Sequence, residues 1–275
     1  MRSVMLAFVI TASTSIASAQ VPVGSPPPSF GVEYTAGTSL DGFEMRRYRD
    51  WQLTVNVTVP TSELQAVLPV GYVVANPAAP ASTVGITLVL QERVEFRFVT
   101  GGIPVGSYGP VDEVLVVATV RNPLGVLENV ILDNLRSTPE AVNMTNAVFG
   151  PGSARLPDML RMELAAEPDG LHRFTAQVVS GRLNIAASAI FGTSGITFLR
   201  KRESPNRFRY VDSSSEPAYA NMSLRAGTSA DLIAVPAADI TFKRDEIRLP
   251  HGTLTVLGVV SGTIFRWQEF VQKLQ

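Results

Sequence analysis

The sequence contains no cysteine, and only two histidines occur among its 275 residues. Without thiolates the chain cannot form disulfides, iron–sulfur clusters or cysteine zinc sites, so burial of a hydrophobic core must stabilise the fold. His172 and His251 are far apart in the sequence and lack the short spacing of a metal-binding pair. We therefore expect no metal site and no cofactor.

Lysine is also scarce, and none precedes Lys201. The total charge is nearly balanced, with 23 basic against 24 acidic residues and a formal net charge of −1. This balance argues against a general electrostatic partner such as nucleic acid or an anionic membrane. No apolar run reaches the roughly 20 residues that a membrane-spanning helix requires, so we expect no membrane span.

The N-terminus has the features of a cleavable secretory signal peptide. Arg2 supplies a positive charge, residues 4–10 form a short apolar run, and Ala17-Ser18-Ala19 is a small-x-small cleavage site. We therefore expect residues 1–19 to be removed and the protein to be secreted or periplasmic.

The rest of the chain divides into a leader and one domain. Residues 20–44 are rich in proline and glycine, which disfavour regular pairing, and we interpret them as a leader or linker. The segment 45–275, about 230 residues, has the size that all-β sandwiches and barrels reach as one domain. Whether this domain forms a homo-oligomer is left open.

Hydrophobic alternation predicts strands through most of the domain. From Trp51 to Val59 every second residue is apolar and the others are polar, as in a half-buried antiparallel strand. The run from Val111 to Val120 is apolar on both faces after Glu113, which predicts a central strand buried on both sides. Further strands are predicted at 85–90, 93–99, 159–165, 171–179, 182–190, 196–201 and 207–211.

Helices are predicted at four places. A capping-box pattern and apolar spacing predict a short helix over 62–68. Helix-start signals with proline at the first helical position predict helices over 122–135 and 138–150. The apolar side chains of residues 263–274 recur at helical spacing, which predicts a closing helix.

Strands on both sides of a central helical insertion predict a mainly β (α+β) fold, an antiparallel barrel or sandwich with a few helices. Three sequons also occur, at Asn56, Asn143 and Asn221. Each would be a glycan acceptor in a eukaryotic host, whereas in a bacterium they have no such meaning.

Several short motifs follow one another along the domain. They are Arg49-Asp50-Trp51 at a strand start, Leu68-Pro69-Val70-Gly71-Tyr72 after the short helix, Tyr108-Gly109-Pro110-Val111-Asp112-Glu113 before an apolar strand, and then Phe149-Gly150-Pro151 and Leu156-Pro157-Asp158. In this order they resemble the acetoacetate decarboxylase superfamily over most of residues 45–275. The resemblance implies a β-barrel-like fold that encloses an apolar cavity.

The resemblance also implies candidate site residues. Arg49 and Glu113 would be the catalytic charges that face the cavity, and Tyr108, Phe149 and Arg155 would contact a ligand. Judged from the residues alone, an arginine or glutamate at a strand end is usually solvated, whereas a buried Arg–Glu pair binds a carboxylate or enol and tunes proton transfer. Both interpretations stay open at this point.

The chain departs from the family at its defining residue. The family's decarboxylases form a Schiff base through a lysine, and the equivalent position here would be Gly152, Ser153 or Ala154, none of which carries an amine. The neighbouring Arg155 stays protonated and cannot act as the nucleophile. The resemblance therefore implies a divergent member that does not form an imine.

Two functions are compatible with these observations. The first is a secreted barrel domain that binds a small apolar keto or carboxylate molecule, with lysine-independent acid–base chemistry such as enolisation, cyclisation or hydrolysis. If the chain is an enzyme, it is then a lyase or isomerase-like member that uses no Schiff base. The second is a non-catalytic, lipocalin-like carrier or structural β-domain, which the apolar content of 45% fits equally well.

Overall fold

The computed structural model describes residues 43–98, 104–149, 152–181, 183–192, 208–210, 219–220 and 222–274. The predicted signal peptide and nearly all of the predicted leader lie outside these residues, as do the sequon at Asn221 and the strand predicted at 196–201.

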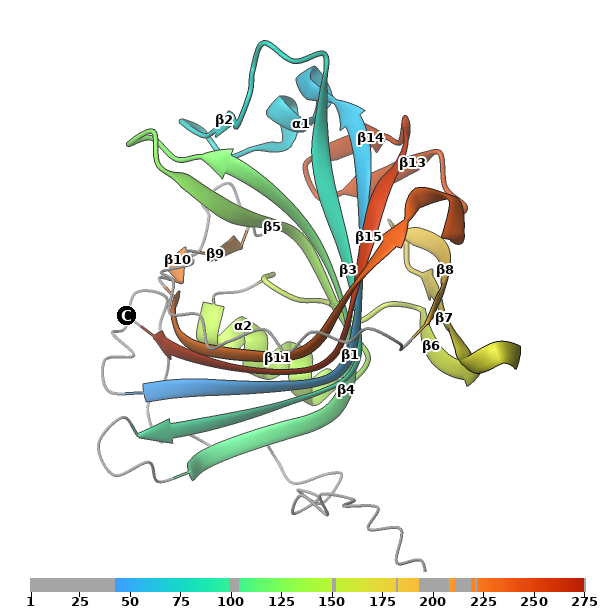
Figure 1. Ribbon diagram of the computed structural model, residues 1–275. Helices are drawn as coiled ribbons and strands as arrows, with labels where there is room; N and C mark the ends of the chain where they lie inside the picture. The colour runs from blue at the N-terminus through green and yellow to red at the C-terminus, as the bar shows by residue number, and fades with distance from the viewer. Residues whose placement is uncertain are drawn as a thin grey trace, which may run out of the picture.

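One large, strongly bent sheet contains most of the described chain (Figure 1). Within the described residues it has nine strands in the order β10-β9-β5-β4-β3-β1-β15-β11, with β2 beside β4. Only the β5–β9 pair among these is parallel. The strands are β1 Phe43–Pro60, β2 Val73–Val74, β3 Ala81–Phe98, β4 Pro104–Arg121, β5 Leu127–Arg136, β9 Phe208–Tyr210, β10 Tyr219–Ala220, β11 Met222–Pro236 and β15 Gly258–Leu274.

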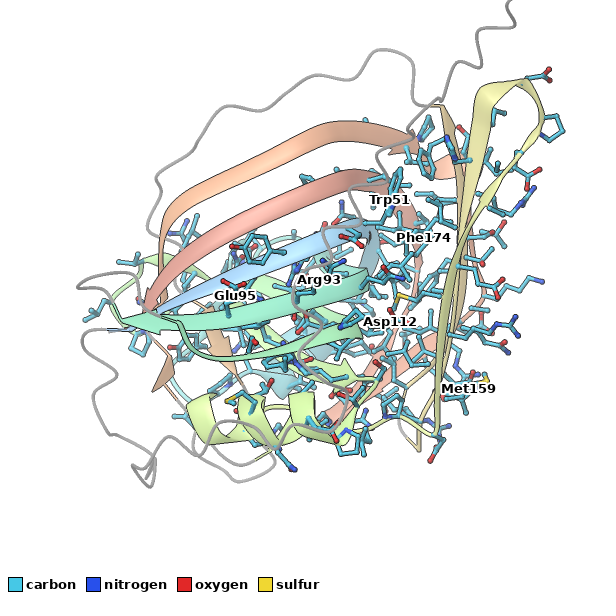
Figure 2. The ribbon with its side chains drawn as sticks, turned by 90° about the horizontal axis from the view of Figure 1, so that it is seen from below. Trp51, Arg93, Glu95, Asp112, Met159 and Phe174 are labelled. Carbon is cyan, nitrogen blue, oxygen red and sulfur yellow. The ribbon has the colours of Figure 1, made fainter. Side chains whose placement is uncertain are left out.

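A smaller antiparallel sheet packs against the convex side of the bend. Its order is β12-β8-β7-β6, and its strands are β6 Met159–Ala166, β7 Leu171–Val179, β8 Asn184–Gly192 and β12 Ile240–Phe242. Figure 2 shows this sheet as a separate layer, with Trp51 and Phe174 lying between the two sheets. The main hydrophobic core is here, because alternate residues of β1 such as Leu53, Val55 and Val57 meet the fully buried Phe174 of β7.

Smaller elements complete the two ends of the molecule. Helix α1 (Thr61–Val67) contacts the hairpin formed by β13 (Glu246–Leu249) and β14 (Gly252–Thr255). Helix α2 (Pro139–Phe149) lies on the concave side of the large sheet and contacts β4 and β5 (Figure 1). Single-turn 3₁₀ helices occur at Pro168–Gly170 and Ala237–Asp239. None of the described helices is long and apolar enough to cross a membrane.

The mainly β class and the antiparallel arrangement are confirmed, whereas closure of the predicted barrel is not. Among the described strands, β10 and β11 stand at opposite ends of the sheet order and do not pair with each other. Residue 221 alone separates them along the chain, so the last residue of β10 lies near the first residue of β11.

Two of the four predicted helices are wrong. Residues 122–135 form a turn and strand β5, and residues 263–274 belong to β15. Asn122 starts a turn rather than a helix, because its Oδ1 accepts hydrogen bonds from the backbone N–H groups of Leu124 and Val126. Gly125 completes this turn at a φ of 75°.

The other two helices are confirmed, α1 near 62–68 and α2 near 138–150. The capping box of α1 does not form, since Gln65 instead binds the backbone of Tyr72 and Val74. The strand predicted at 111–120 is confirmed as a central strand, because β4 pairs with β3 on one side and β5 on the other. The runs at 85–90 and 93–99 form one strand, β3.

Candidate functional site

The bend of β1 brings side chains from both of its halves to the concave side. In an uninterrupted strand Arg49 and Gln52 would point to opposite faces. Here Nη1 of Arg49 donates a hydrogen bond of 2.6 Å to Oε1 of Gln52, so the two side chains lie together. Trp51 points the other way, toward the small sheet, where its ring centroid lies 5.6 Å from that of Phe191.

Strand β3 has a matching irregularity at its own bend. Gln91 adopts a positive φ of 57°, and the register with β4 shifts between Val89 and Glu92. Glu92 is fully buried and lies opposite Arg49 in the pairing with β1. The bend therefore places a carboxylate of β3 beside the arginines of β1.

Five buried charged side chains from four strands meet at this point. Arg47 and Arg49 of β1 donate through their Nε atoms to Oε1 of Glu92, at 2.8 and 2.9 Å. Their Nη2 atoms lie 2.7 and 3.0 Å from Oε2 of Glu113 on β4. Arg136 of β5 donates through Nη1 to Oε2 of Glu92 at 2.9 Å and through Nη2 to Oε1 of Glu113. We call these five residues the charged cluster.

The charged cluster is removed from water. Each of its five residues is at most 7% exposed, and both glutamates are fully buried. Buried ions are costly unless they are paired and hydrogen-bonded, and each carboxylate oxygen here has at least one guanidinium partner. As described, the cluster holds three guanidiniums and two carboxylates.

Tyr108 of β4 extends the charged cluster. Its hydroxyl oxygen accepts a hydrogen bond of 2.6 Å from Nη1 of Arg136, and the guanidinium carbon of Arg136 lies 5.5 Å from the ring centroid. Gly109, the next residue, has a φ of 115°, and a Cβ atom there would lie 2.5 Å from the backbone oxygen of Glu92. Only glycine therefore allows β4 to approach β3 this closely beside the cluster.

The surroundings of Glu92, Arg136 and Tyr108 set their protonation states. Burial alone would raise the pKa of Glu92, but Arg47, Arg136 and Arg49 hold that pKa well below its usual range. Burial would lower the pKa of Arg136, yet its neighbours, Glu113 foremost, raise that pKa further. Burial raises the pKa of Tyr108 far above its usual value. At neutral pH these groups are therefore fixed charges and hydrogen-bond donors, not proton carriers.

Two polar groups beside the cluster have no hydrogen-bond partner among the described residues. The side-chain Nδ2 and Oδ1 of Asn134 are both buried and unpaired, and so is Nε of Arg136. Asn134 and Arg136 lie opposite Leu115 and Glu113 in an unshifted part of the β4–β5 register, so they share one face of β5.

Arg49, Glu113 and Tyr108, predicted from the sequence as site residues, thus come together. Arg155 does not join them, because its Nε and Nη2 donate to Asp133 at 3.0 and 2.6 Å, on the other face of β5. Phe149 ends α2, and its side chain lies outside the described part of the structure.

Sequence reasoning missed Arg47, Glu92, Gln52 and Arg136. Two of them left a signal, since Arg47 is two residues before Arg49 and Glu92 interrupts an apolar run. Arg136 left none, because its segment had the spacing of a helix.

Residues 152–154, where the resemblance would place the family's lysine, lead into a segment that lies beside β5. Arg155 N donates to Asn134 O and Arg136 N donates to Arg155 O, which docks residues 153–155 along β5. Ser153 and Ala154 are buried there, and neither has an amine. The exposed Lys243 follows β12 of the small sheet, on the opposite side of the large sheet.

A separate groove of about 640 Å³ lies on the convex side, between the bend and β6. Trp51, Leu90, Met162 and Leu164 contribute its apolar lining. His172 stacks on Phe191 close by, with the ring centroids 5.7 Å apart, and so has a packing role. The described residues hold no group of three or more side chains placed to bind a metal ion.

No family model and no curated protein matches this sequence. Solved structures do match. The enduracididine biosynthesis enzyme MppR complexed with pyruvate has a TM-score of 0.54 at 12% identity, covering 87% of this chain and 92% of that one. The same enzyme complexed with the condensation product of pyruvate and imidazole 4-carboxaldehyde has a TM-score of 0.53 at 12% identity, covering 85% and 88%.

Acetoacetate decarboxylase from Legionella pneumophila has a TM-score of 0.47 at 13% identity, covering 100% of this chain and 98% of that one. The chain therefore shares its fold with the MppR structures. At 12% identity this likeness extends to the fold alone.

Proposed function

We propose that this chain binds a small keto acid at the charged cluster and polarises its carbonyl group without forming a covalent bond to it. The observation that supports the proposal is the convergence of three buried guanidiniums, from Arg47, Arg49 and Arg136, on the concave side of the large sheet. The proposal includes export, since residues 1–19 have the features of a signal peptide.

The chemistry of the cluster suits such a ligand. Guanidinium groups bind carboxylates through paired, charge-assisted hydrogen bonds, and they do so most strongly where water is excluded. Arginines already held by Glu92 and Glu113 need little reorganisation when negative charge develops on a ligand's carbonyl oxygen. The site is therefore suited to stabilise an enolate.

An imine mechanism has no support in the cluster. Ser153 and Ala154 occupy the segment beside β5, and among the side chains that line the described cluster there is no lysine. Arg136 stays protonated because Glu113 and Glu92 surround it. The carbonyl carbon of the ligand thus meets cations and hydrogen-bond donors, not an amine.

The experiment is reductive trapping. Borohydride added with pyruvate or acetoacetate should leave the intact mass of the protein unchanged, and acetoacetate should release no acetone. An adduct on Lys201, Lys243 or Lys273, located by peptide mapping, would overturn the proposal and indicate a relocated nucleophile. A known Schiff-base decarboxylase treated in parallel provides the positive control.

A non-catalytic carrier is the second candidate. The fixed protonation states of Glu92, Arg136 and Tyr108 favour it, because none of them exchanges protons readily at neutral pH. Proton NMR of pyruvate in deuterium oxide separates the two functions. Faster loss of the methyl signal than with an Arg49→Met variant indicates catalysed enolisation, and binding with equal loss indicates a carrier.

A further inference from the structure

Three unpaired polar atoms share one face of β5, next to the charged cluster. They are Nδ2 and Oδ1 of Asn134 and Nε of Arg136. Asn134 is 2% exposed and Arg136 is 1% exposed. Two residues along a strand separate the backbone positions by roughly 7 Å, so one small molecule can reach both side chains.

The unpaired, buried amide of Asn134 lowers the stability of the folded protein. A buried amide without partners has lost its hydrogen bonds to water and gained none in exchange. Leucine has the same branched arrangement of side-chain heavy atoms and carries no polar group that would need a partner. Folds keep such a group where it serves a function, and Asn134 lies on the face of β5 that presents Arg136 to Glu113.

We propose that Asn134 and Nε of Arg136 select a carboxylic acid that carries a hydrogen-bond donor beside its carbonyl group, an amide or a hydroxyl. The inference rests on the proposed function and specifies its ligand class. Nε of Arg136 donates to the carboxylate, and Nδ2 of Asn134 donates to the carbonyl. Oδ1 of Asn134 can only accept, so the ligand must offer an N–H or O–H group to it.

Pyruvate and oxamate form a matched pair of probes. Both carry a carboxylate next to a carbonyl, but oxamate has an NH₂ group where pyruvate has a methyl group. Pyruvate can satisfy Nε and Nδ2 and leaves Oδ1 unpaired, whereas oxamate satisfies all three atoms. The additional hydrogen bond that oxamate donates to Oδ1 increases its affinity about tenfold over that of pyruvate.

The test measures ligand affinity and thermal stability of the full chain and of two variants. Asn134→Leu removes the unpaired amide. Asn129→Leu is the matched control on the same strand, because the Oδ1 atom of Asn129 already accepts a hydrogen bond of 2.9 Å from Thr119. We expect the wild type to bind oxamate about tenfold more tightly than pyruvate, and Asn134→Leu to lose that preference.

Thermal stability gives the second readout, in the absence of ligand. Asn134→Leu should raise the Tm by about 2–4 °C, because it removes a desolvated amide from a domain of this size. Asn129→Leu should leave the preference for oxamate intact and should not raise the Tm.

The possible failures are distinct. Binding of pyruvate without a preference for oxamate overturns the inference and leaves the proposed function standing. A lower Tm in Asn134→Leu also overturns it, since the amide would then be satisfied by ordered water. If the wild type binds neither probe, the proposed function fails and this inference fails with it.

Discussion

The charged cluster illustrates how buried ions act at the scale of single residues. Ion pairs of this kind contribute little net stability, because desolvation offsets most of their attraction, yet breaking one leaves an uncompensated charge. Glu92 and Glu113 each use one oxygen for the arginines of β1 and the other for Arg136. The cluster therefore depends on all of its members.

Substituting Arg136 with methionine should destabilise the protein by about 3 kcal/mol. The change leaves one oxygen of Glu92 and one of Glu113 without the guanidinium that binds it, and loss of one member of a buried pair costs about 3–5 kcal/mol. The lower end applies because Arg47 and Arg49 still neutralise both carboxylates. Urea denaturation measures the difference.

Arg161→Met provides the matched control. Arg161 pairs with Glu163 at 2.5 Å on the surface, with side chains 71% and 56% exposed, and such pairs contribute about 0–1 kcal/mol. Similar losses in the two variants would show that the charged cluster is hydrated in solution, against its burial in the structure.

Acid should weaken the fold through Glu92. The arginines hold its pKa far below the value in the unfolded chain. Its contribution to the free energy of unfolding is therefore complete above about pH 4.3 and is lost as the pH falls further. Asp50 and Asp112 act in the opposite sense, because burial raises the pKa of each. Carbon-13 NMR of the glutamate carboxyl groups should show Glu92 still ionised at pH 3, and titration near pH 4 would contradict the pairing.

At the scale of elements, the sequence predicted the strands and helices whose signals come from neighbouring residues, such as a helix cap or a regular alternation of polar and apolar side chains. Helix α2 begins where Thr138 accepts a hydrogen bond from the backbone of Ala141, as the start signal at Thr138-Pro139 indicates. The first strand, β1, has one polar and one apolar face, so its period of two is visible in the sequence.

Strand β5 could not be recognised from its pattern. Its residues from 130 to 136 are buried on both faces, which hides the period of two, and Leu127, Ile131 and Leu135 happen to fall four residues apart. The Asn122 turn uses the same side-chain chemistry as a helix start, with the asparagine oxygen bound to backbone N–H groups ahead of it. Strand β15 is decided by pairing with β1 and β11, which are distant in the sequence.

The same limit applies to the site. Arg49, Glu113 and Tyr108 could be predicted from the sequence, because they lie next to strands with a clear alternation and within the family-like motifs. Arg136 and Asn134 lie on β5, most of which was predicted to be a helix, so no argument from the sequence could place them beside Glu92. Arg155 was included for its position in the chain alone, and the structure pairs it with Asp133 on the opposite face.

At the scale of the whole molecule, the large sheet serves two purposes with its two faces. The convex face packs on the small sheet and forms the core, whereas the concave face carries the charged cluster and is covered in part by α2 (Figure 1). Strand β4 contributes to both, since Val114 and Val116 belong to the core and Glu113 to the cluster. The hydrophobic core and the charged cluster therefore meet in this strand.

Amide hydrogen exchange should accordingly be slowest in β4, from Val114 to Val120. This segment is hydrogen-bonded to β3 and β5 on its two sides, and most of its side chains are buried, so exchange there requires global unfolding. Strand β6 is the internal control, because β7 is its one partner among the described strands and its residues are mostly exposed, so it should exchange through local opening. Mass spectrometry of peptides from the two strands compares their protection directly. Protection of Val114 to Val120 no greater than that of β6 would mean that β4 is not held between two neighbours, and both the central position of this strand and the geometry of the cluster that it carries would then be wrong.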